Sequence, residues 1–387
     1  MTTLFLEPLD VLFLRGNKLF GDPGSYGEAL LPPWPSVAAG ALRSRMLADA
    51  GIDLKAFAEG EISHPVLGTP KNPGSFTVTA FHLARRVEGN IEPLFVPPAD
   101  LNLEAPKEKD APPKQVRALN PHPAPQGILT SFSLPSLPIL AQKNRGKPAS
   151  GYWLTAAGWA HYLAGGVPDQ KEHWVTSGKL WQSDERIGIG LNAATRSAKE
   201  GDLFSVQAVA FLRDVGFLAA TEGDGGKAPQ DGSLRLGGDG RATAVAVADA
   251  TFPEANVVDI ARARRCRLIL STPGIFEAGW LPTGAIQDDN SGNNGVAFNL
   301  HGVRARLTAA AVPRFATVSG WDLAKWQPKP AQRAAPTGSV YWLEDIEADE
   351  AALKRLIAEG LWETRDQNPA RRVEGFNRCV VAAWNRQ

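Results

Sequence analysis

The residues of this chain that are best suited to chemistry lie in the stretch from Leu31 to Gly51. Ser36, Gly40 and Arg43 are four and three residues apart, so a helix would place them on one face. A hydroxyl near a helix N-terminus, a glycine that exposes backbone and a guanidinium that pairs with phosphate together favour anion binding. The alternative is a core helix in which Gly40 packs against a strand and Arg43 lies in solvent.

The helix that must position these residues is delimited by its ends. Prolines hold the approach extended, Ser36 is a natural N-cap and Gly51 supplies the stop, which predicts a helix from Val37 to Ala50. On such a helix a second face, distinct from the one with Ser36, Gly40 and Arg43, carries apolar side chains and should be buried. The stripe consists of Ala39, Leu42, Met46 and Ala50.

The sequence lacks the common catalytic patterns. Its six histidines show no metal-ligand spacing, and there is no nucleophile elbow, P-loop or dinucleotide fingerprint, so we expect neither a metal nor a cofactor. The turn LGGDG at Leu236–Gly240 resembles the metal-binding turn of polymerase-like cyclases, but Gly240 replaces its second carboxylate. We interpret it as a backbone turn. Alternatively, it packs near RNA with Arg241 on a phosphate.

Composition limits the possible partners and the compartment. The chain has 387 residues, 43% of them hydrophobic, and equal numbers of basic and acidic side chains, 41 of each. A polyanion must therefore be held by local patches. Without a signal region or an apolar run near ~18 residues, the chain is expected to be cytoplasmic with no membrane span. Cys266 and Cys379 are expected to be reduced and buried.

Basic residues gather in three local patches. Such clusters are usually solvated faces, but three of them in a neutral chain without catalytic constellations favour nucleic-acid binding. The patches comprise Arg262, Arg264, Arg265 and Arg267; Lys143, Arg145 and Lys147; and Arg371, Arg372 and Arg378.

The N-terminal part begins with a strand, a loop, the helix and two further strands. Strands are predicted at Thr2–Leu14, with Pro8 at a bulge or edge, and at Phe76–Arg86 and Ile91–Val96. A basic loop from Arg15 to Gly27, which contains Lys18, joins the first strand to the helix. The resulting β-α-β-β order is the first part of a ferredoxin-like unit.

The middle of the chain predicts one excursion and one hairpin. The hydrophobic residues of Pro97–Ser150 show little periodicity, and we interpret this segment as a long inserted loop. A short helix is predicted at Thr155–Leu163. Glu185–Leu212 predicts a β-hairpin whose polar tip carries Arg196 and Lys199.

The second half is rich in strands and contains one late helix. The helix is predicted at Asp349–Leu361, where acidic residues in the first turn complement its dipole. The pattern fits a second ferredoxin-like unit, and a glycine-rich stretch favours a boundary nearby, giving an α+β protein with domains at 1–250 and 251–387. The predicted strands are Arg262–Ser271, Val303–Thr317, Ser339–Leu343 and Phe376–Trp384.

Two adjacent motifs, FLEPLDVLFLRGNKLFGDPGSYG and LPPWPSVAAGALRSRML, resemble a known family. They are similar to the N-terminal signature of the third subunit of type III-B (Cmr) CRISPR effector complexes, a RAMP protein related to the Cas-five family. Four later segments resemble that family in the same order: ERIGIGLNAATRSAKEGDLF, LRLGGDGR, TGSVYWLE and GFNRCVVAAW. The likeness runs from Thr2 to Trp384 and leaves Pro97–Ser150 and Gln287–Leu300 unmatched.

The resemblance implies a fold and a set of partners. The fold would be two ferredoxin-like (RRM-like) domains with antiparallel sheets, a projecting β-hairpin and long inserted loops, without nuclease activity. The subunit would hold the 5′ tag of the crRNA and contact both the large polymerase-like (GGDD) subunit and the backbone RAMP subunit. It would meet target RNA only indirectly.

By matching position, the resemblance assigns RNA binding to three parts of the chain. These are the basic loop with the following helix, the hairpin, and a C-terminal glycine-containing loop. The corresponding residues are Arg15, Lys18, Ser36, Gly40 and Arg43; Arg186, Arg196 and Lys199; and Gly375, Phe376 and Asn377. An alternative is a RAMP endoribonuclease that processes precursor crRNA, for which His64 or His82 would have to act as acid or base.

Overall fold

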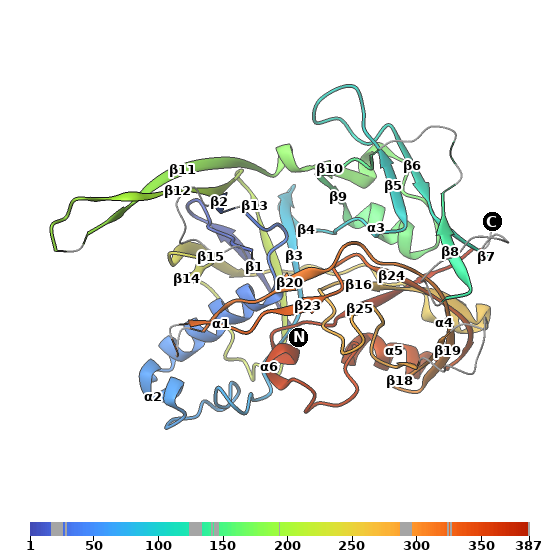
Figure 1. Ribbon diagram of the computed structural model, residues 1–387. Coiled ribbons are helices and arrows are strands. Elements are labelled where there is room, and N and C mark those ends of the chain that lie inside the picture. Colours follow the sequence, from blue (N-terminus) through green and yellow to red (C-terminus); the bar gives the residue numbers. More distant parts are fainter. Residues whose placement is uncertain are drawn as a thin grey trace. The chain divides into compact units, whose positions relative to one another are not determined.

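The computed structural model describes residues 1–16, 26–27, 29–123, 134–140, 142, 147–192, 194–286, 296–322, 325 and 327–385 (Figure 1). They form two compact units, each assembled from separate stretches. The first unit comprises Met1–Glu92, Gly178–Ala250 and Thr317–Gln332, and the second comprises Pro93–Ser177, Thr251–Ala316 and Arg333–Gln387. One crossing of the chain between the units follows Ala250. The excursion after Pro97, however, groups with the second unit rather than with the first.

The first unit is built on a six-stranded sheet with the order β14-β15-β1-β13-β3-β4. The central strand β1 runs antiparallel to β13 and β15, and β13 runs antiparallel to β3. Leu4, Phe5 and Leu6 are all buried, so both faces of β1 are covered. The strands are β1 (Thr2–Pro8), β3 (Thr77–Val87), β4 (Asn90–Leu94), β13 (Val215–Glu222), β14 (Ser233–Leu236) and β15 (Arg241–Val247).

Helices α1 (Pro35–Asp49) and α2 (Leu54–Glu59) belong to the same unit. α1 packs against β3 and β14. Three of the four residues predicted to be its apolar stripe, Ala39, Leu42 and Met46, are buried. The fourth, Ala50, is exposed because the helix ends at Asp49 and Ala50 is its C-cap.

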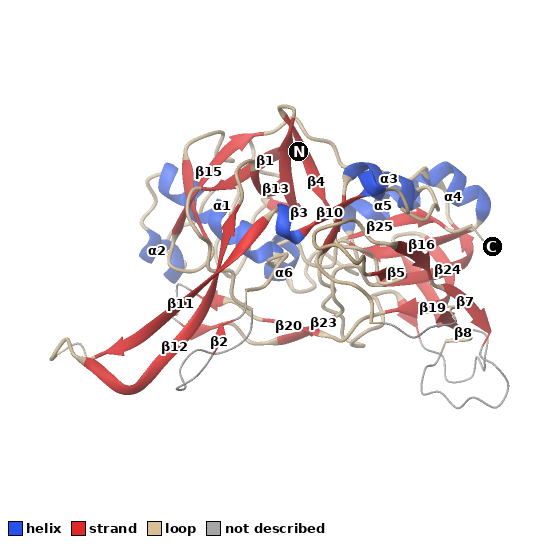
Figure 2. Ribbon diagram, turned by 90° about the horizontal axis from the view of Figure 1, so that it is seen from above, coloured by secondary structure: helices blue, strands red, loops and turns tan. Residues whose placement is uncertain are grey.

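The predicted hairpin is formed by β11 (Trp181–Leu191) and β12 (Ala198–Phe211). Its strands pair antiparallel from Trp181 opposite Phe211 to Leu191 opposite Ala198. In Figure 1 the hairpin extends well past the sheet of its own unit, and Figure 2 shows the same projection from above. One short strand and one short strand pair also belong to the unit: β2 (Tyr26–Gly27), which runs parallel to β12, and β21 (Trp321–Asp322) with β22 (Gln327–Pro328).

The second unit contains another six-stranded sheet, with the order β17-β18-β19-β24-β16-β25. Helices α4 (Val257–Ala263) and α5 (Glu350–Glu359) pack on it, and α6 (Pro369–Val373) follows. The strands are β16 (Arg265–Leu270), β17 (Ala285–Ile286), β18 (Val296–Leu300), β19 (Val303–Ala311), β24 (Val340–Glu347) and β25 (Cys379–Ala383). β20 (Ala316–Val318) and β23 (Gln332–Ala334) lie where the chain passes between units.

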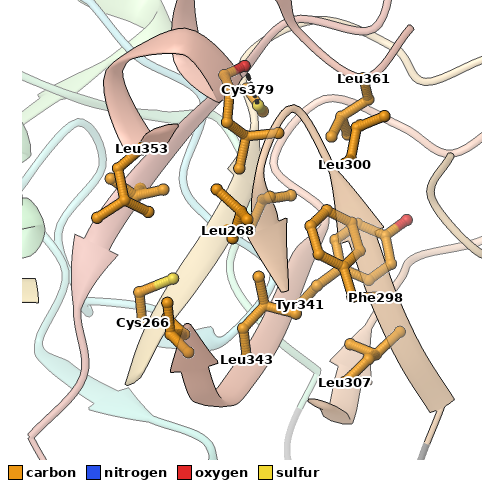
Figure 3. Close-up of a cluster of buried hydrophobic side chains, with 14 of the residues drawn as sticks. Cys266, Leu268, Phe298, Leu300, Leu307, Tyr341, Leu343, Leu353, Leu361 and Cys379 are labelled. Carbon is orange, nitrogen blue, oxygen red and sulfur yellow. Dashed lines mark hydrogen bonds between the residues drawn. The ribbon is translucent and has the colours of Figure 1, made fainter. Parts of the chain in front are cut away.

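One core of the second unit lies between this sheet and its helices (Figure 3). Leu268 and Leu343 from the sheet meet Leu353 from α5 in this cluster. Cys266 and Cys379 belong to the same core as free, buried thiols. Burial raises the pKa of each thiol to about 12, so both remain protonated.

A second core of this unit combines Leu101, Leu103 and Val116 of the excursion with residues on both sides of it. The rings of Phe95 and Trp159 stack with centroids 4.7 Å apart, and Tyr162 continues the stack 5.6 Å from Trp159. The predicted short helix is α3 (Ala156–Leu163), capped by Thr155. The other elements are β5 (Leu101–Glu104), β6 (Gln115–Ala118), β7 (Asn120–Pro123), β8 (Ser136–Ile139), β9 (Tyr152–Leu154) and β10 (Trp174–Thr176), with short 3-10 turns at Lys171–His173 and Ser177–Lys179.

The two large sheets share a strand order. In the first, four strands lie in the order β15-β1-β13-β3, and in the second, four lie in the order β25-β16-β24-β19. Numbered along the chain, each set reads 4-1-3-2. The coarse prediction of a mixed protein with antiparallel sheets is confirmed. Within the described residues, every helix is too short or too polar to cross a membrane.

Candidate nucleic-acid interface

The first strand ends earlier than the sequence suggested. The predicted strand from Thr2 to Leu14, with Pro8 at a bulge or edge, is too long because β1 already ends at Pro8, which has no backbone N–H to donate. Asp10 then accepts a hydrogen bond from the Val11 N–H at 2.7 Å, which stabilises a turn. The chain therefore leaves the large sheet before it reaches Arg15.

Beyond this turn, Leu12 and Phe13 connect two distant parts of the first unit. Leu12 bridges Val209 of β12, with N–O distances of 2.9 Å in both directions. Phe13 bridges Gly238, whose N–H donates to the Phe13 carbonyl at 2.8 Å. The base of the hairpin and the LGGDG turn are thus joined by one stretch of backbone.

The LGGDG turn packs directly on Phe13. A Cβ at Gly237 would lie 2.9 Å from the Phe13 carbonyl oxygen, and Gly237 has a φ of +74°, so this position requires glycine. Asp239 is exposed and also has a positive φ, of +58°. The structure therefore matches the interpretation of a tight backbone turn with an outward carboxylate.

Cationic side chains surround Phe13. The guanidinium carbons of Arg241 and Arg186 lie 5.0 and 5.8 Å from the Phe13 ring centroid. The third cation is Arg15, because a Cβ at Gly238 would lie 3.9 Å from Arg15 Nε. We call Phe13, Arg15, Arg186 and Arg241 the Phe13 cluster. It unites Arg15 and Arg186, which the resemblance assigned from separate motifs, with Arg241, which the sequence offered as an alternative contact of the LGGDG turn. Phe13 itself was missed because it reads as an ordinary strand residue.

Two carboxylates hold the guanidiniums of the Phe13 cluster. Asp10 Oδ2 accepts from Arg241 Nη1 at 2.8 Å, and Asp184 Oδ2 accepts from Arg186 Nη2 at 2.8 Å. The Val11 N–H, together with Arg241 and Arg186, holds the pKa of Asp10 below its ordinary value. Arg241 Nε is buried without a hydrogen-bond acceptor among the described residues. Arg241 therefore retains an unsatisfied donor beside an exposed aspartate turn.

The hairpin carries its other predicted residues far from this cluster. Arg196 lies in the tip turn, where its N–H donates to the Asn192 carbonyl at 2.7 Å. Lys199 forms an exposed ion pair with Asp202 at 3.7 Å. The tip begins six residues beyond Arg186, or about 20 Å along an extended strand. The structure thus places Arg196 and Lys199 at the tip of the hairpin and Arg186 at the middle of β11.

One face of the hairpin between these positions is apolar and exposed. Ile187, Ile189 and Leu191 alternate along β11, with Leu203 opposite Ile189, and Ile187 is 76% exposed. Gly188 belongs to the opposite face, where the Phe204 ring of the partner strand covers it, since a Cβ at Gly188 would lie 2.3 Å from that ring. The sequence missed this apolar stripe because alternation normally predicts a buried face.

The N-terminus of α1 differs from the one predicted for the anion-binding face. Ser36 is not the N-cap: Pro35 is already helical and Trp34 is the N-cap, with no capping hydrogen bond from its side chain. Gly40 is exposed and a Cβ there would meet nothing within 4 Å, so it does not pack against a strand. Arg43 is half-buried on the same helix. Lys18 lies outside the described residues, as do Lys143 and Arg145.

The C-terminal loop is internal. Phe376 and Asn377 are both completely buried. Asn377 Oδ1 accepts from the Ile275 N–H at 2.6 Å, and its Nδ2 donates to the Leu361 carbonyl at 3.1 Å. Gly375, also buried, supplies a φ of +92° for the turn. These side chains present no surface to RNA, contrary to the assignment by resemblance.

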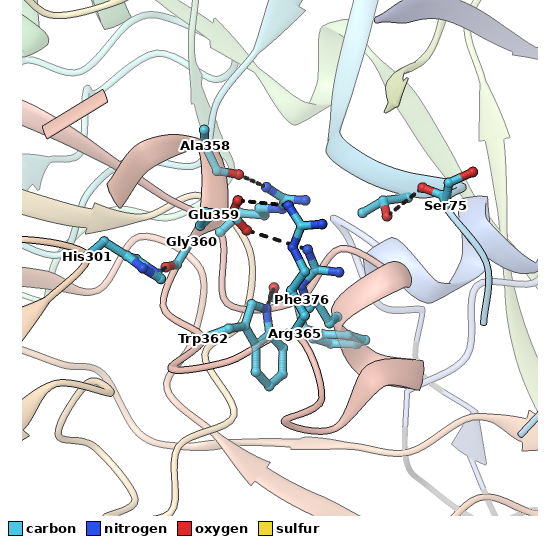
Figure 4. Close-up of polar contacts among 11 residues, drawn as sticks. Ser75, His301, Ala358, Glu359, Gly360, Trp362, Arg365 and Phe376 are labelled. Carbon is cyan, nitrogen blue, oxygen red and sulfur yellow. Dashed lines mark hydrogen bonds and ion pairs between the residues drawn. The ribbon is translucent and has the colours of Figure 1, made fainter. Parts of the chain in front are cut away.

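The basic patch around this loop is used within the second unit (Figure 4). Arg371 pairs with Glu374 at 3.0 Å in a buried ion pair, and Arg378 donates to the Ala358 carbonyl at 2.6 Å. Arg365 and Arg372 both reach Glu359, at 3.3 and 3.5 Å. Although burial alone would raise it, the pKa of Glu359 is held below its ordinary value by these two guanidiniums.

In the patch at residues 262–267, Arg262 is exposed on a helix and Arg267 is buried. Arg262 belongs to α4 rather than to the predicted strand, and it pairs with Asp259 at 3.1 Å. Arg267 is buried: it pairs with Asp100 at 3.0 Å, donates to the Tyr162 carbonyl at 2.9 Å and lies 4.0 Å from the Tyr162 ring centroid. The hydroxyl of Tyr162 donates to Asp100 at 2.8 Å. This network fastens the excursion to the sheet of its own unit.

The two candidate catalytic histidines have structural surroundings. His64 is buried, and its Nδ1 accepts from the N–H groups of Val66 and Leu67 at 3.2 Å each. Removal from water lowers the pKa of His82 to about 4, so this residue is neutral near pH 7 and a weak base. Among the described residues, no three His, Cys, Asp or Glu side chains gather as a metal site would require.

Comparison with known proteins gives a family and a fold. The family model described as CRISPR-associated protein (Cas_Cmr3) matches residues 4–384. The search of curated proteins found no match. A chain in a cryo-EM structure of the Type III-B Cmr-beta bound to cognate target RNA is similar in fold, with a TM-score of 0.51 and 14% identity over 97% of this chain and 96% of that one.

A second solved structure is similar to the same degree. It is a cryo-EM structure of the Type III-B Cmr-beta bound to cognate target RNA and AMPPnP, state 1, with a TM-score of 0.51, 14% identity and coverage of 97% of this chain and 95% of that one. At 14% sequence identity, the likeness to these two structures shows only that the fold is shared. The family match covers nearly the whole sequence and confirms the resemblance found in its motifs. The chain belongs to the Cmr3 family of CRISPR-associated proteins.

Proposed function

We propose that this protein is a non-catalytic RNA-binding subunit of a type III-B CRISPR effector complex. It holds the 5′ tag of the crRNA and bridges the large polymerase-like subunit to the backbone RAMP subunits. Membership of the Cmr3 family supports this proposal, as does a fold shared with chains of Cmr-beta complexes bound to target RNA. The Phe13 cluster is the observation in the chain itself that carries it.

The Phe13 cluster suits a phosphodiester backbone. Guanidinium groups pair bidentately with phosphate, and such contacts hold the position of an RNA strand without reading its bases. The aromatic ring of Phe13 contacts both Arg186 and Arg241. Each such cation–π contact stabilises the position of its arginine by about 0.5–1 kcal/mol. The ion pairs of these arginines with Asp184 and Asp10 are partly exposed and therefore contribute little free energy. Replacing the carboxylate of each pair by a phosphate of the RNA therefore costs little free energy.

The projecting hairpin extends this interface. Its apolar stripe offers aliphatic side chains of the kind that contact or separate bases, while Arg196 and Lys199 at the tip pair with phosphates. The α1 face at Ser36, Gly40 and Arg43 continues the interface within the same unit. We further propose that each large sheet is a ferredoxin-like unit, because its four core strands have the 4-1-3-2 order of that fold.

The central experiment measures RNA affinity at several salt concentrations. Fluorescence anisotropy with a labelled single-stranded RNA carrying the repeat-derived tag would compare the wild type with Arg186→Gln, Arg241→Gln and the double variant. Loss of each phosphate contact should reduce the slope of log K against log salt by about 0.7. Unchanged slopes in both single variants would remove the Phe13 cluster from the interface.

Arg213→Gln is the matched control. Arg213 is in the same unit, its side chain is 95% exposed, and it forms only a long 3.8 Å pair with Asp214. Its replacement removes the same charge from a different place and should leave the slope unchanged. An equal effect of this variant would mean that bulk charge, rather than the cluster, holds the RNA.

The non-catalytic part of the proposal has its own test. Neither His64 nor His82 is suited to proton transfer, since the Nδ1 of one is engaged and the pKa of the other is about 4. Purified protein incubated with repeat RNA in EDTA should leave the RNA intact. Cleavage that disappears in His82→Ala would instead establish a RAMP endoribonuclease that processes precursor crRNA.

A further inference from the structure

The second unit carries an exposed aromatic side chain with an arginine over its ring. Phe315 directly precedes β20 and is 55% exposed. The guanidinium carbon of Arg333, in β23, lies 5.1 Å from the centroid of the Phe315 ring. Both residues belong to the second unit. We call Phe315 and Arg333 the Phe315 pair.

Such exposure is rare among the aromatic residues of this chain. Of the phenylalanines, tyrosines and tryptophans whose side chains the structure describes, only Phe315 and Trp321 are exposed, and all others are buried or half-buried. An aromatic ring stabilises a fold most when it is buried, so the exposed surface of Phe315 contributes little to folding. This surface is therefore available to a ligand.

The backbone next to each member of the Phe315 pair is anchored in the core of the second unit. Val312, three residues before Phe315, packs against the core that contains Leu268 and Leu343. Ala335, two residues after Arg333, belongs to the same core. Its backbone exchanges two hydrogen bonds with that of residue 274, at 2.8 and 2.9 Å. The pair is therefore presented by two segments whose positions are fixed by packing.

The charge at the Phe315 pair is positive. Arg333 and Arg314, the residue directly before Phe315, are both exposed, and neither forms an ion pair with a carboxylate in the described part of the chain. The sequence from Val312 to Ala335 contains four basic residues and one acidic residue, in a chain whose charges otherwise balance.

The neighbouring carboxylates do not compensate these charges through ion pairs. Glu277, which follows the segment bridged to Ala335, is exposed and pairs with neither arginine. In β24, Val340 lies opposite Ala311, four residues before Phe315. The first acidic residue of that strand, Glu344, is four residues further along, or about 13 Å. The Phe315 pair thus combines an exposed ring with a local excess of positive charge.

We propose that the Phe315 pair stacks a base of single-stranded RNA, and that Arg314 and Arg333 contact the phosphates next to that base. An exposed aromatic ring accepts the flat face of any base, and arginine adds charge and a planar surface of its own. The inference rests on the proposed function, in which the protein holds the tag of the crRNA. It adds a contact to a base, whereas the Phe13 cluster contacts phosphates.

Affinity measurements with the full-length protein and the labelled RNA described above separate stacking from charge. Phe315→Leu keeps an apolar side chain but removes the aromatic face, so it should weaken binding about fivefold or more and leave the salt slope unchanged. Arg314→Gln and Arg333→Gln should each reduce the slope by about 0.7, the value of one phosphate contact. Wild-type affinity of Phe315→Leu overturns the stacking site, and unchanged slopes in both arginine variants overturn its phosphate contacts.

Two variants of the same unit serve as matched controls. Ile286 is 57% exposed, so Ile286→Ala removes a comparable apolar surface elsewhere. Arg355 is exposed on α5, so Arg355→Gln removes a comparable charge. Both variants should bind RNA as the wild type does. Losses equal to those of the Phe315 and Arg333 variants would show that the surface as a whole, rather than the pair, attracts RNA.

Abasic substitutions in the RNA locate the stacked base. Each nucleotide of the labelled RNA is replaced in turn by an abasic nucleotide, and the affinities of the wild type and of Phe315→Leu are compared. At the stacked position the wild type should lose about fivefold or more, whereas Phe315→Leu should lose little because the contact is already absent. Equal losses for the two proteins at every position contradict stacking on Phe315.

The same measurements distinguish failure of this site from failure of the proposed function. If Arg186→Gln and Arg241→Gln reduce the salt slope while Phe315→Leu binds as the wild type does, the proposed function stands and the stacking site is wrong. If only Phe315→Leu weakens binding, and does so equally for an unrelated single-stranded RNA of the same length, the stacking site stands and the tag-holding role of the Phe13 cluster is wrong.

Discussion

At the scale of single residues, the two units use arginine differently. In the second unit, Arg267, Arg371 and Arg378 are buried and bonded to groups of the same unit, so their charges serve folding. In the first unit, Arg186 and Arg241 have partly exposed carboxylate partners and share one aromatic ring. A run of basic letters in the sequence does not distinguish these cases, because the acidic and carbonyl partners come from distant parts of the chain.

The Arg267 network makes a clear stability prediction. Asp100→Ala removes the carboxylate from Arg267 and leaves a buried, unpaired guanidinium, which should lower the free energy of unfolding by about 3–5 kcal/mol. Urea unfolding followed by tryptophan fluorescence measures this loss. Glu347→Ala breaks an exposed pair with Arg304 in the same unit and should cost less than about 1 kcal/mol. Equal costs for the two variants would show that the buried network is not structural.

His82 predicts a pH dependence of stability. Its pKa is about 4 in the folded protein and ordinarily about 6.5, so between these values the unfolded chain binds the additional proton. The neutral ring therefore contributes to the free energy of unfolding in full above pH 6.5, and this contribution is lost as the pH falls towards 4. The free energy of unfolding of the wild type should fall more than that of His82→Gln over this window. Parallel curves for the two proteins would contradict the lowered pKa.

At the scale of elements, the sequence predicted those helices and strands whose ends carry local signals such as prolines, glycines and capping residues. α1, α3, α5 and the hairpin were all found near their predicted bounds. The first strand was predicted too long because the effect of Pro8 depends on whether a partner strand needs its N–H. The Arg262 segment was assigned to a strand because seven residues of α4 are too few to show a helical period.

The N-cap correction on α1 can be tested by comparison with α5. Ser36→Ala should change the free energy of unfolding by less than about 0.5 kcal/mol, because Ser36 lies inside the helix and Trp34 is the N-cap. Asp349 caps α5 by accepting from the Ala352 N–H at 2.8 Å, so Asp349→Ala should cost about 1 kcal/mol. Thermal unfolding of the two variants measures both changes. A larger loss for Ser36→Ala would restore Ser36 as the cap.

At the scale of the whole molecule, the sequence predicted two sheet-based domains but not how the chain is shared between them. Each unit is assembled from three stretches, and the excursion belongs to the second because its aromatic core and Asp100 pack there. Such long-range pairing has no local signal. For the same reason, the candidate site was predicted in pieces: Arg15, Arg186 and Arg241 came from separate motifs, while Phe13 acquires its proposed role only from the arginines that folding brings to it.

The most direct test of the proposed role is to map where RNA touches the full-length protein. A single-stranded RNA with the crRNA tag and 4-thiouridine would be crosslinked by ultraviolet light, and the modified peptides identified by mass spectrometry. We expect crosslinks in the first unit, on peptides that contain Phe13, the β11 segment from Arg186 to Leu191, or the Leu236–Gly240 turn. Crosslinks confined to the second unit, for example around Gly375, would contradict the account.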